Sequence, residues 1–316
     1  MKLRRYTSYA LLLCIAFLAL TACKKEESEE EKREALIWTL IQDISADSIR
    51  NDVVWLQNMG SRFSLADNHL AIAMKIEKKF RDLGFSNAFL DTFNIVKTFR
   101  NVAYEQKQYN VISFIEGTEY PDSLCVIGGH YDNILGISDL SVVPGANDNA
   151  SGTSAVLEVA RVMKKNNYRP KSTIMFIAFG AEELGLLGSR DFATSPLGFS
   201  GKIRFMLNSD MIAYENSSSP ADWFVNIMDY DNSHPLRLEA ESICDKYTVL
   251  NYINNNTYNK QSDSYPFFTN GYKALFFFSG DNDPNYHTLN DLASNCNFGY
   301  CAEIVKLQCA LLADKN

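Results

Sequence analysis

Five short blocks of the sequence carry side chains that can bind metals or transfer protons. Glu182 and Glu183 are adjacent acids in FGAEELG, at the end of an apolar run. The other blocks hold His130 and Asp132 in IGGHYDN, Asp148 in PGANDNASG, Asp210 in LNSDMIAY and His287 in YHTLND. The chain has only 4 histidines, and two of them fall in this set. Acids and histidines that each lie at the end of a strand-like apolar run predict one common site.

The chemistry that these residues favour is metal binding. Carboxylates that converge in one cleft repel one another and do not all ionise without a cation. Imidazole nitrogen and carboxylate oxygen are ligands that zinc takes in proteins, although Co²⁺ or Mn²⁺ can substitute for it. One carboxylate can bridge two ions, and each ion then keeps an open position for water. The residue types therefore predict a zinc site in which one carboxylate bridges two ions.

Each group has a simpler interpretation when it is taken alone. His130 would be a hydrogen-bonded structural histidine, and Asp148 would cap a helix, since NDNASG is good capping sequence. Glu182 and Glu183 would be a solvated pair at a helix start, and Asp210 would cap a turn. The five blocks share a placement at strand ends, and this favours the metal site over five unrelated roles.

The elements that must position these blocks alternate between strands and helices. Strand-like apolar runs cover residues 109–117, 122–132, 172–180, 202–211, 223–229 and 273–281. Helical spacing covers residues 35–44, 67–85, 151–166 and 299–315, and Gly84 is a helix stop. This alternation predicts an α/β fold with a largely parallel sheet and helices on both faces. Ligands bind such sheets at the carboxyl ends of the strands.

The composition sets limits on the class of protein. A chain of 316 residues with 46% hydrophobic and 22% charged residues is long enough for one large α/β domain. The formal net charge is −8, and the sequence has no basic stripe. Binding to nucleic acid requires clustered Lys and Arg, so nucleic acid is excluded as a partner.

The N-terminus is typical of a targeting segment. MKLRRY is basic, and ALLLCIAFLAL is apolar but too short to span a bilayer comfortably. LTAC, which ends at Cys23, resembles the lipobox of bacterial lipoproteins, although an ordinary secretory peptide is the alternative. We expect a lipoprotein signal peptide over 1–22, a charged solvated tether over 23–34 and a folded domain over 35–316. The expected location is the bacterial cell envelope, where lipid on Cys23 anchors the protein to the outer membrane, on its periplasmic or surface face.

The cysteines do not predict a disulfide framework. The chain has 7 cysteines, of which Cys14 lies in the signal and Cys23 would carry lipid. The remaining number is odd and cannot pair completely. We expect Cys125 to be a buried thiol, while Cys296 and Cys301 are able to form a loop disulfide in an oxidising compartment.

Taken in order, the blocks resemble the metal-binding blocks of a known family. GGHYDN, PGANDNASG, AFGAEELGLLGS, NSDMIAY and YHTLND are similar to those of the M28 metallopeptidases, the co-catalytic zinc aminopeptidases. The resemblance runs from about Leu36 to the C-terminus. It implies a three-layer α/β/α sandwich around a mixed, mostly parallel sheet.

The resemblance also implies a role for each residue. Asp148 would bridge two Zn²⁺ ions; His130 and Asp210 would complete one site, and Glu183 and His287 the other. Glu182 would be the general base that takes a proton from the metal-bound water and gives it to the leaving amine. Asp132 would orient the His130 imidazole, as the second ring nitrogen of a metal-bound histidine commonly requires.

Outside these blocks the sequence departs from the family pattern. Many relatives carry Ser-Asp-His where this chain has Ser262-Asp263-Ser264. Asp263 would then help to shape the cleft. Tyr258 would stabilise an oxyanion or be a plain surface tyrosine. Asp291 would support His287.

The implied activity is that of a zinc-dependent exopeptidase, first of all an aminopeptidase that acts on peptides with a free N-terminus. A glutaminyl cyclase is an alternative, because that related fold uses one zinc to convert N-terminal Gln to pyroglutamate. A carboxypeptidase and a non-catalytic ectodomain are further alternatives. Relatives of the last kind lose metal ligands, whereas this chain keeps all five.

Overall fold

The computed structural model describes residues 28–137, 139–198, 202–279 and 282–316. The chain divides into two units, Met1–Leu36 and Ile37–Asn316. The predicted signal peptide and the predicted lipidation site, Cys23, lie outside the described residues. Among the described residues, no helix combines the length and the apolar character needed to cross a membrane.

In the first unit, helix α2 (Glu29–Gln42) begins inside the segment predicted as a tether. The Ser28 hydroxyl accepts a hydrogen bond from the Glu31 N–H at 3.1 Å, and the Ser28 N–H donates to the Glu31 carboxylate at 2.7 Å. This reciprocal pair is a capping box, which satisfies N–H groups at a helix start. The charged side chains of residues 29–33 are exposed, so the described part of this segment is a solvated helix.

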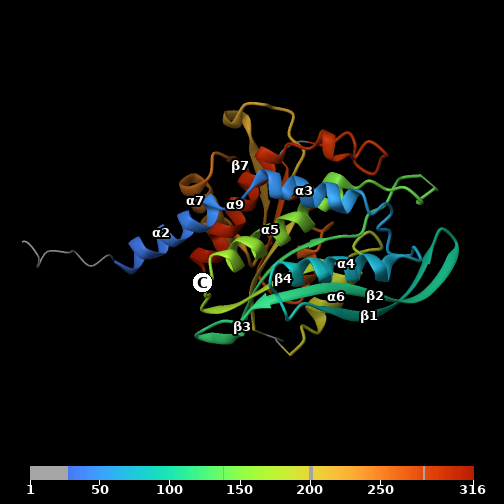
Figure 1. The fold of residues 1–316 in the computed structure, drawn as a ribbon, viewed down its shortest axis with the longest axis horizontal. Helices are drawn as coiled ribbons and strands as arrows, with labels where there is room; N and C mark the ends of the chain where they lie inside the picture. The colour runs from blue at the N-terminus through green and yellow to red at the C-terminus, as the bar shows by residue number, and fades with distance from the viewer. Residues whose placement is uncertain (1–27, 138, 199–201, 280–281) are drawn as a thin grey trace, which may run out of the picture. The chain divides into compact units, whose positions relative to one another are not determined.

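The second unit contains the end of α2 and the remaining elements (Figure 1). Its further helices are α3 (Ala46–Gln57), α4 (His69–Asp82), α5 (Gly152–Lys165), α6 (Leu187–Thr194), α7 (His234–Tyr247), α8 (Ser264–Thr269) and α9 (Phe298–Asp314). Its strands are β1 (Phe89–Phe99), β2 (Val102–Ile115), β3 (Tyr120–His130), β4 (Ser172–Phe179), β5 (Ile203–Ser209), β6 (Phe224–Met228), β7 (Asn251–Ile253) and β8 (Ala274–Ser279).

The strands form one sheet in the order β1-β2-β4-β3-β5-β8-β6-β7. Parallel pairing joins β4 to β3, β3 to β5, β5 to β8 and β6 to β7. Antiparallel pairing joins β1 to β2, β2 to β4 and β8 to β6. The predicted fold class, an α/β fold around a mixed sheet, is therefore confirmed. The parallel centre brings the carboxyl ends of β4, β3 and β5 to the same edge.

Apolar side chains cover both faces of the sheet. All eight residues of β4 are buried. Phe176 and Ala178 belong to one core cluster with residues of α3, α4, α5, α7 and α9, whereas Ile177 and Phe179 belong to a second cluster with α6 and α8. Successive side chains of a strand point to opposite faces, so a strand that is covered on both sides is a continuous apolar run.

The outer strands β1 and β7 have no counterpart among the predicted strands, and β2 begins at Val102 instead of near Tyr109. The reason is that β1 and the first half of β2 form an arm with exposed polar side chains. Arg100 and Asn101, at its turn, both have positive φ, as a two-residue hairpin turn requires. The sequence has neither Gly nor Asn-Gly there, so it indicates this hairpin only weakly.

The cysteines of the described part are free thiols. Cys125 is buried, as predicted, and Cys244, Cys296, Cys301 and Cys309 are also unpaired. The possible disulfide between Cys296 and Cys301 does not form in this structure.

Candidate functional site

The central strands deliver the predicted site residues to one edge of the sheet. His130 is the last residue of β3, and Asp210 directly follows β5. Glu182 and Glu183 lie in the turn between β4 and α6. Asp148 lies in the buried loop that leads into α5, and its peptide bond to Asn149 is cis.

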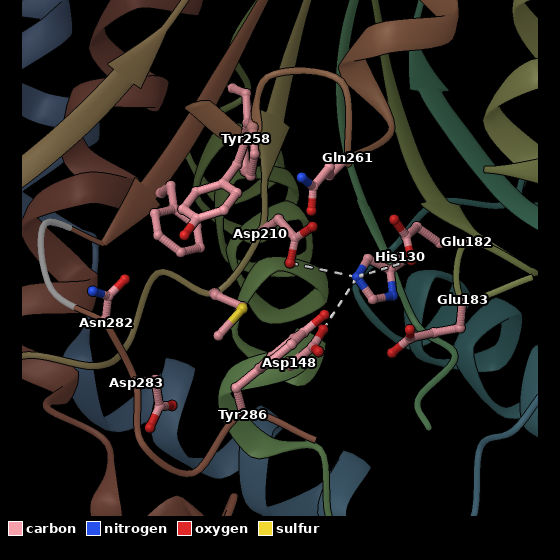
Figure 2. A pocket seen from close by; sticks show the side chains of 13 residues that line it. His130, Asp148, Glu182, Glu183, Asp210, Tyr258, Gln261, Asn282, Asp283 and Tyr286 are labelled. Carbon is pink, nitrogen blue, oxygen red and sulfur yellow. Dashed lines mark ion pairs between the residues drawn. The ribbon is translucent and has the colours of Figure 1, made fainter. Parts of the chain in front are cut away.

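His287 comes from the long segment between β8 and α9. The five predicted blocks therefore meet, although they are far apart in the sequence. Figure 2 shows the site residues of four of these blocks, His130, Asp148, Glu182 with Glu183, and Asp210, around one pocket.

Asp148 lies between the two histidines and turns one oxygen to each. Its Oδ1 is 3.4 Å from Nε2 of His130, and its Oδ2 is 3.1 Å from Nε2 of His287. Asp210 Oδ1 is 3.4 Å from the same His130 nitrogen, and Glu183 Oε2 is 3.3 Å from that of His287. Two groups of three potential metal ligands thus share a single carboxylate.

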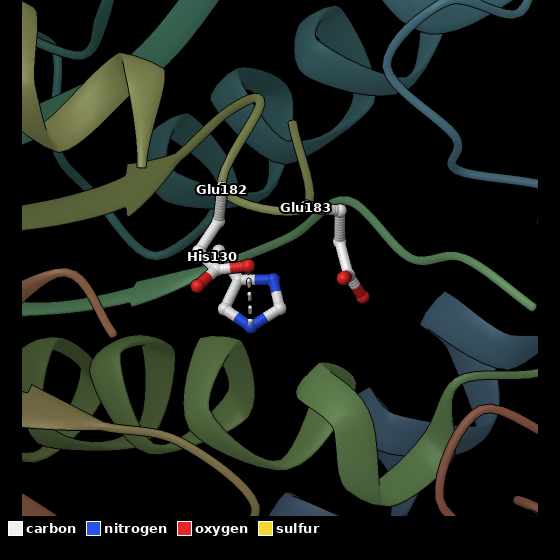
Figure 3. A group of neighbouring side chains, drawn as sticks. All are labelled: His130, Glu182 and Glu183. Carbon is white, nitrogen blue, oxygen red and sulfur yellow. Dashed lines mark ion pairs between the residues drawn. The ribbon is translucent and has the colours of Figure 1, made fainter. Parts of the chain in front are cut away.

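The carboxylates of the two adjacent glutamates lie at different places, that of Glu182 against the His130 ring and that of Glu183 farther along (Figure 3). Glu182 lies beside His130, with its Oε2 3.9 Å from Nε2, whereas Glu183 reaches the His287 side. The turn allows this because Ala181 has φ of 59° and Gly185 has φ of 110°. Positive φ at Gly185 costs little, since glycine has no Cβ.

The electrostatics of the cluster require a positive charge. Burial raises the pKa of Glu182 well above its ordinary value, and burial with the nearby Asp148 raises the pKa of Glu183 to about 7. Burial opposes protonation of His287, but the carboxylates of Asp148 and Glu183 beside the ring outweigh it and raise the pKa to about 10. In the same way, carboxylates outweigh burial and raise the pKa of His130. Protons would therefore neutralise this cluster where a metal ion does not.

The donor set also fits zinc. Nε2 of His287 and Oε1 of Glu183 are buried and have no hydrogen-bond partner within the described residues. Such atoms are costly unless a ligand satisfies them. Imidazole nitrogens and carboxylate oxygens are ligands of Zn²⁺, so the residues present suit this ion.

Asp132 holds both sides of the site in register. Its Oδ1 accepts from the Glu182 N–H at 3.1 Å, and its Oδ2 accepts from the Glu183 N–H at 3.2 Å and from the Ser64 hydroxyl at 2.8 Å. Nδ1 of His130 lies 3.1 Å from the Asp132 carbonyl oxygen and 3.6 Å from its Oδ1. Asp132 therefore lies next to His130 and also fixes the glutamate turn.

Asp291 supports a different residue from the one predicted. Its carboxylate accepts from the backbone N–H groups of Asn147 at 2.6 Å and Asp148 at 3.0 Å, which anchors the Asp148 loop. Among the described residues, Asp291 makes no hydrogen bond to His287, whose carbonyl oxygen accepts instead from the Gly136 N–H at 3.0 Å. Burial raises the pKa of Asp291 to about 7.

Arg62 is a buried residue that the sequence reasoning missed. Its guanidinium donates to the carbonyl oxygens of Leu56, Tyr131, Pro144 and Gly145 at 2.6–3.1 Å. Burial lowers its pKa to about 10, so the side chain remains charged at neutral pH. No motif identifies such a residue, because its partners are backbone groups distant in the sequence.

Ser262 was also not predicted to act at the site. Its hydroxyl donates to Oδ2 of Asp210 at 2.6 Å and accepts from the Asn208 side chain at 2.6 Å. Next to it, Asp263 is fully buried, and neither of its carboxylate oxygens has a hydrogen-bond partner among the residues described. Burial raises the pKa of Asp263 to about 7. Asp263 does not line the pocket at the site.

A pocket of about 190 Å³ opens beside the cluster. Its polar side is formed by His130, Asp148, Glu182, Glu183 and Asp210, and Met211, Phe276 and Phe278 provide apolar wall. Tyr258 lines the same pocket with 39% of its surface exposed, so it is not merely a surface tyrosine. The pocket can accept a small apolar side chain next to the ligand cluster.

The sheet topology and the paired ligand groups define a class of metal-dependent hydrolase built on an α/β/α sandwich. The chain belongs to peptidase family M28, which matches residues 110–312. The family predicted from the sequence is therefore confirmed, as are the predictions of a metallopeptidase of the aminopeptidase type and of zinc.

Individual relatives agree with this family. A probable leucine aminopeptidase of Arthroderma otae is 25% identical over 288 residues, which cover 87% of this chain and 74% of that protein. A probable aminopeptidase of Saccharomyces cerevisiae is 30% identical over 64% of this chain, and the match spans only 56% of its length.

Solved structures share the fold. A zinc aminopeptidase from Bacillus subtilis has a TM-score of 0.71 at 18% identity and covers 86% of this chain and 95% of its own. A glutaminyl cyclase from Bacteroides thetaiotaomicron has a TM-score of 0.68 at 17% identity, with coverage of 87% and 99%. The fold alone therefore does not separate the two activities.

Arg62 generates a testable prediction. Arg62→Leu removes the Arg62 donors from four buried carbonyl groups. Those of Leu56 and Gly145 keep the N–H groups of Met59 and Ala150, whereas within the described residues no second donor reaches those of Tyr131 and Pro144, which cost about 1–3 kcal/mol each. We expect the free energy of unfolding to fall by about 3 kcal/mol or more. Zinc affinity should fall as well, because Gly145 lies in the loop that carries Asp148. Urea denaturation and zinc titration measure the two effects.

Arg50→Leu is the matched control, since Arg50 is an exposed arginine whose ion pair with Asp47 is 3.0 Å long. The assignment of Arg62 as the support of this loop is wrong if both variants behave like the wild type.

Proposed function

We propose that this chain is an aminopeptidase that uses two Zn²⁺ ions to hydrolyse the N-terminal peptide bond of peptides with a free N-terminus. The observation that carries the proposal is the position of Asp148, which turns one carboxylate oxygen to each histidine. One zinc would be held by His130, Asp210 and Asp148, and the other by His287, Glu183 and Asp148. When bound, zinc lowers the pKa of water and polarises a carbonyl group.

Glu182 is proposed as the general base. It lies with His130 and Glu183 in a third group of potential ligands, but the two groups that share Asp148 are complete without it. Its carboxylate would take a proton from the attacking water and pass it to the amine that leaves. Burial raises its pKa, and a base works best when its pKa is near the working pH. Asp132 holds the Glu182 backbone, so the carboxylate keeps its direction during proton transfer.

Other residues would bind and position the substrate. Met211, Phe276 and Phe278 would contact the side chain of the N-terminal residue. Asp283 lines the same pocket, and its carboxylate adds to a negative environment that favours the free ammonium group. Tyr258 would donate its hydroxyl to the oxygen on which negative charge develops.

Two alternative activities are weaker. A glutaminyl cyclase of related fold would need one zinc, and a second complete group of ligands would then have no use. A carboxypeptidase substrate would present no free ammonium group to the pocket that Asp148, Glu182, Glu183 and Asp210 line.

The experiment that tests the proposed function incubates the zinc-loaded protein with free, N-acetylated and Gln-initiated peptides and follows their masses. Stepwise loss of N-terminal residues from the free peptides alone is expected. Loss of ammonia from Gln-initiated peptides would make the protein a cyclase. Trimming of C-terminal residues would replace the aminopeptidase assignment by a carboxypeptidase.

The bridging role of Asp148 predicts a loss of metal. We expect two zinc ions per wild-type chain, and fewer than one in Asp148→Asn, because an amide bridges two cations poorly. Elemental analysis after gel filtration measures the ratio. Asp122→Asn is the control, since Asp122 is 82% exposed and its ion pair with Lys202 is remote from the site. Full zinc content in Asp148→Asn would remove the bridging assignment.

The role of Glu182 predicts a loss of turnover without a loss of metal. Glu182→Gln should retain zinc, while kcat falls by about 10²- to 10⁴-fold, the usual contribution of general acid–base catalysis. Peptide hydrolysis and elemental analysis of the same sample measure both. Glu119→Gln, at an exposed glutamate, should match the wild type. A Glu182→Gln protein of near-normal kcat would exclude this base.

We also propose that Cys23 carries lipid and anchors the protein in the bacterial cell envelope. The support is the sequence alone, since LTAC follows a basic and then an apolar segment. Cys23→Ala should move the protein from the membrane fraction to the soluble fraction. A wild-type protein found only in the soluble fraction would contradict the anchor.

A further inference from the structure

A second depression adjoins the pocket at the metal ligands. It has a volume of about 360 Å³ and shares Glu182, Glu183, Gln261 and Tyr286 with that pocket. It then continues over Gly185, Leu186, Arg190, Lys260 and Tyr265. The proposed general base, Glu182, therefore stands at the boundary between the two hollows. A peptide bond cleaved there would place its acyl side in one hollow and its amine side in the other.

The two hollows differ in charge. Apart from the shared glutamates, the residues of the second depression that are charged at neutral pH are Arg190 and Lys260. Both are exposed, and within the described residues no ion pair or side-chain hydrogen bond engages either of them. A third cation lies close by, because Nζ of Lys97 would be 3.8 Å from a Cβ on Gly185. In contrast, the first pocket holds Asp148, Asp210 and Asp283 and no Lys or Arg.

From this asymmetry we infer that the second depression is a subsite for a carboxylate on the leaving-group side of the scissile bond, and that Arg190 and Lys260 recognise it. This inference rests on the proposed function. A guanidinium offers paired donors to a carboxylate, and an ammonium adds a compact charge. The acidic pocket takes the free ammonium group of the substrate, and the basic depression takes its carboxylate. The opposite charges of the two hollows therefore set the direction in which a peptide binds.

The subsite favours short peptides. An extended residue spans about 3.3–3.6 Å, so the C-terminal carboxylate of a dipeptide lies within a few ångströms of the scissile bond. In longer peptides the same chemistry comes from an acidic side chain directly after that bond. Both sources are carboxylates, and matched amides distinguish them.

The test measures kcat/KM of the zinc-loaded full chain for Leu-Ala and Leu-Ala-amide, and for Leu-Glu-amide and Leu-Gln-amide. We expect each charged substrate to exceed its neutral partner about tenfold or more, the range for hydrogen bonds to charged groups. In the double variant Arg190→Gln, Lys260→Gln, both ratios should fall to near 1, mainly through KM. Rates for the neutral amides and the zinc content should not change.

Lys75→Gln is the matched control, because Lys75 is an exposed lysine of α4 away from the depression. A preference only for Leu-Ala would assign the subsite to the C-terminus, and a preference only for Leu-Glu-amide would assign it to a side chain. Equal rates within both pairs, or ratios that the double variant leaves unchanged, would overturn the subsite while the aminopeptidase assignment stands. Failure to cleave any of the four peptides would instead refute the proposed function.

Discussion

Mutual repulsion among buried carboxylates is the constraint on which the rest of this structure depends. Asp148, Glu182, Glu183 and Asp210 all line one pocket with His130, and three of them are less than one-tenth exposed. Burial and neighbouring acids raise the pKa of Glu182 and Glu183, so without a cation this end of the sheet would hold protons. Zinc would compensate the repulsion among these carboxylates, and the fold places imidazole and carboxylate ligands where they can bind the ion.

Hydrogen bonds from neighbouring residues stabilise this arrangement of carboxylates. The Asp148 loop is held on one side by the Asp291 carboxylate and on the other by the Arg62 guanidinium. Asp210 is held by the Ser262 hydroxyl. These contacts fix the directions of the backbone and the carboxylates before any ligand binds, so binding loses less conformational entropy. Asp132, which accepts from the Glu182 N–H, holds Glu182 at the boundary between the acidic pocket and the basic depression.

Sequence reasoning could nominate His130, Glu183 and Asp210 as candidate ligands because each lies in a short motif at the end of a strand. Asp148 and His287 lie in longer loops, so their nomination depended on the family resemblance of their motifs. The parallel centre of the sheet followed from its apolar strands. Sequence reasoning missed Arg62, because the guanidinium binds four backbone carbonyl groups. Every residue has such a group, so no sequence motif marks the partners. Sequence reasoning linked Asp291 to the nearby His287, whereas the folded chain brings Asp291 to backbone N–H groups of Asn147 and Asp148.

The edges of the fold were harder to predict than its centre for a related reason. β4 is buried on both faces and reads as an apolar run, but the β1–β2 arm is largely exposed and its polar residues hide the strand pattern. The charged segment before Leu36 was predicted as a tether, yet Ser28 and Glu31 cap a helix there. Exposed elements depend on turns and caps more than on hydrophobic periodicity.

Asp132 has a consequence for how mutations at this site combine. One carboxylate receives the N–H groups of both glutamates and lies against the His130 ring, so three functional side chains share a single support. Residues that share a partner do not contribute independent free energies. Losses measured separately at Asp132, His130 and Glu182 will therefore overlap, and their sum will exceed the loss in the triple variant. A substitution at Asp132 therefore acts on the positions of His130, Glu182 and Glu183 together.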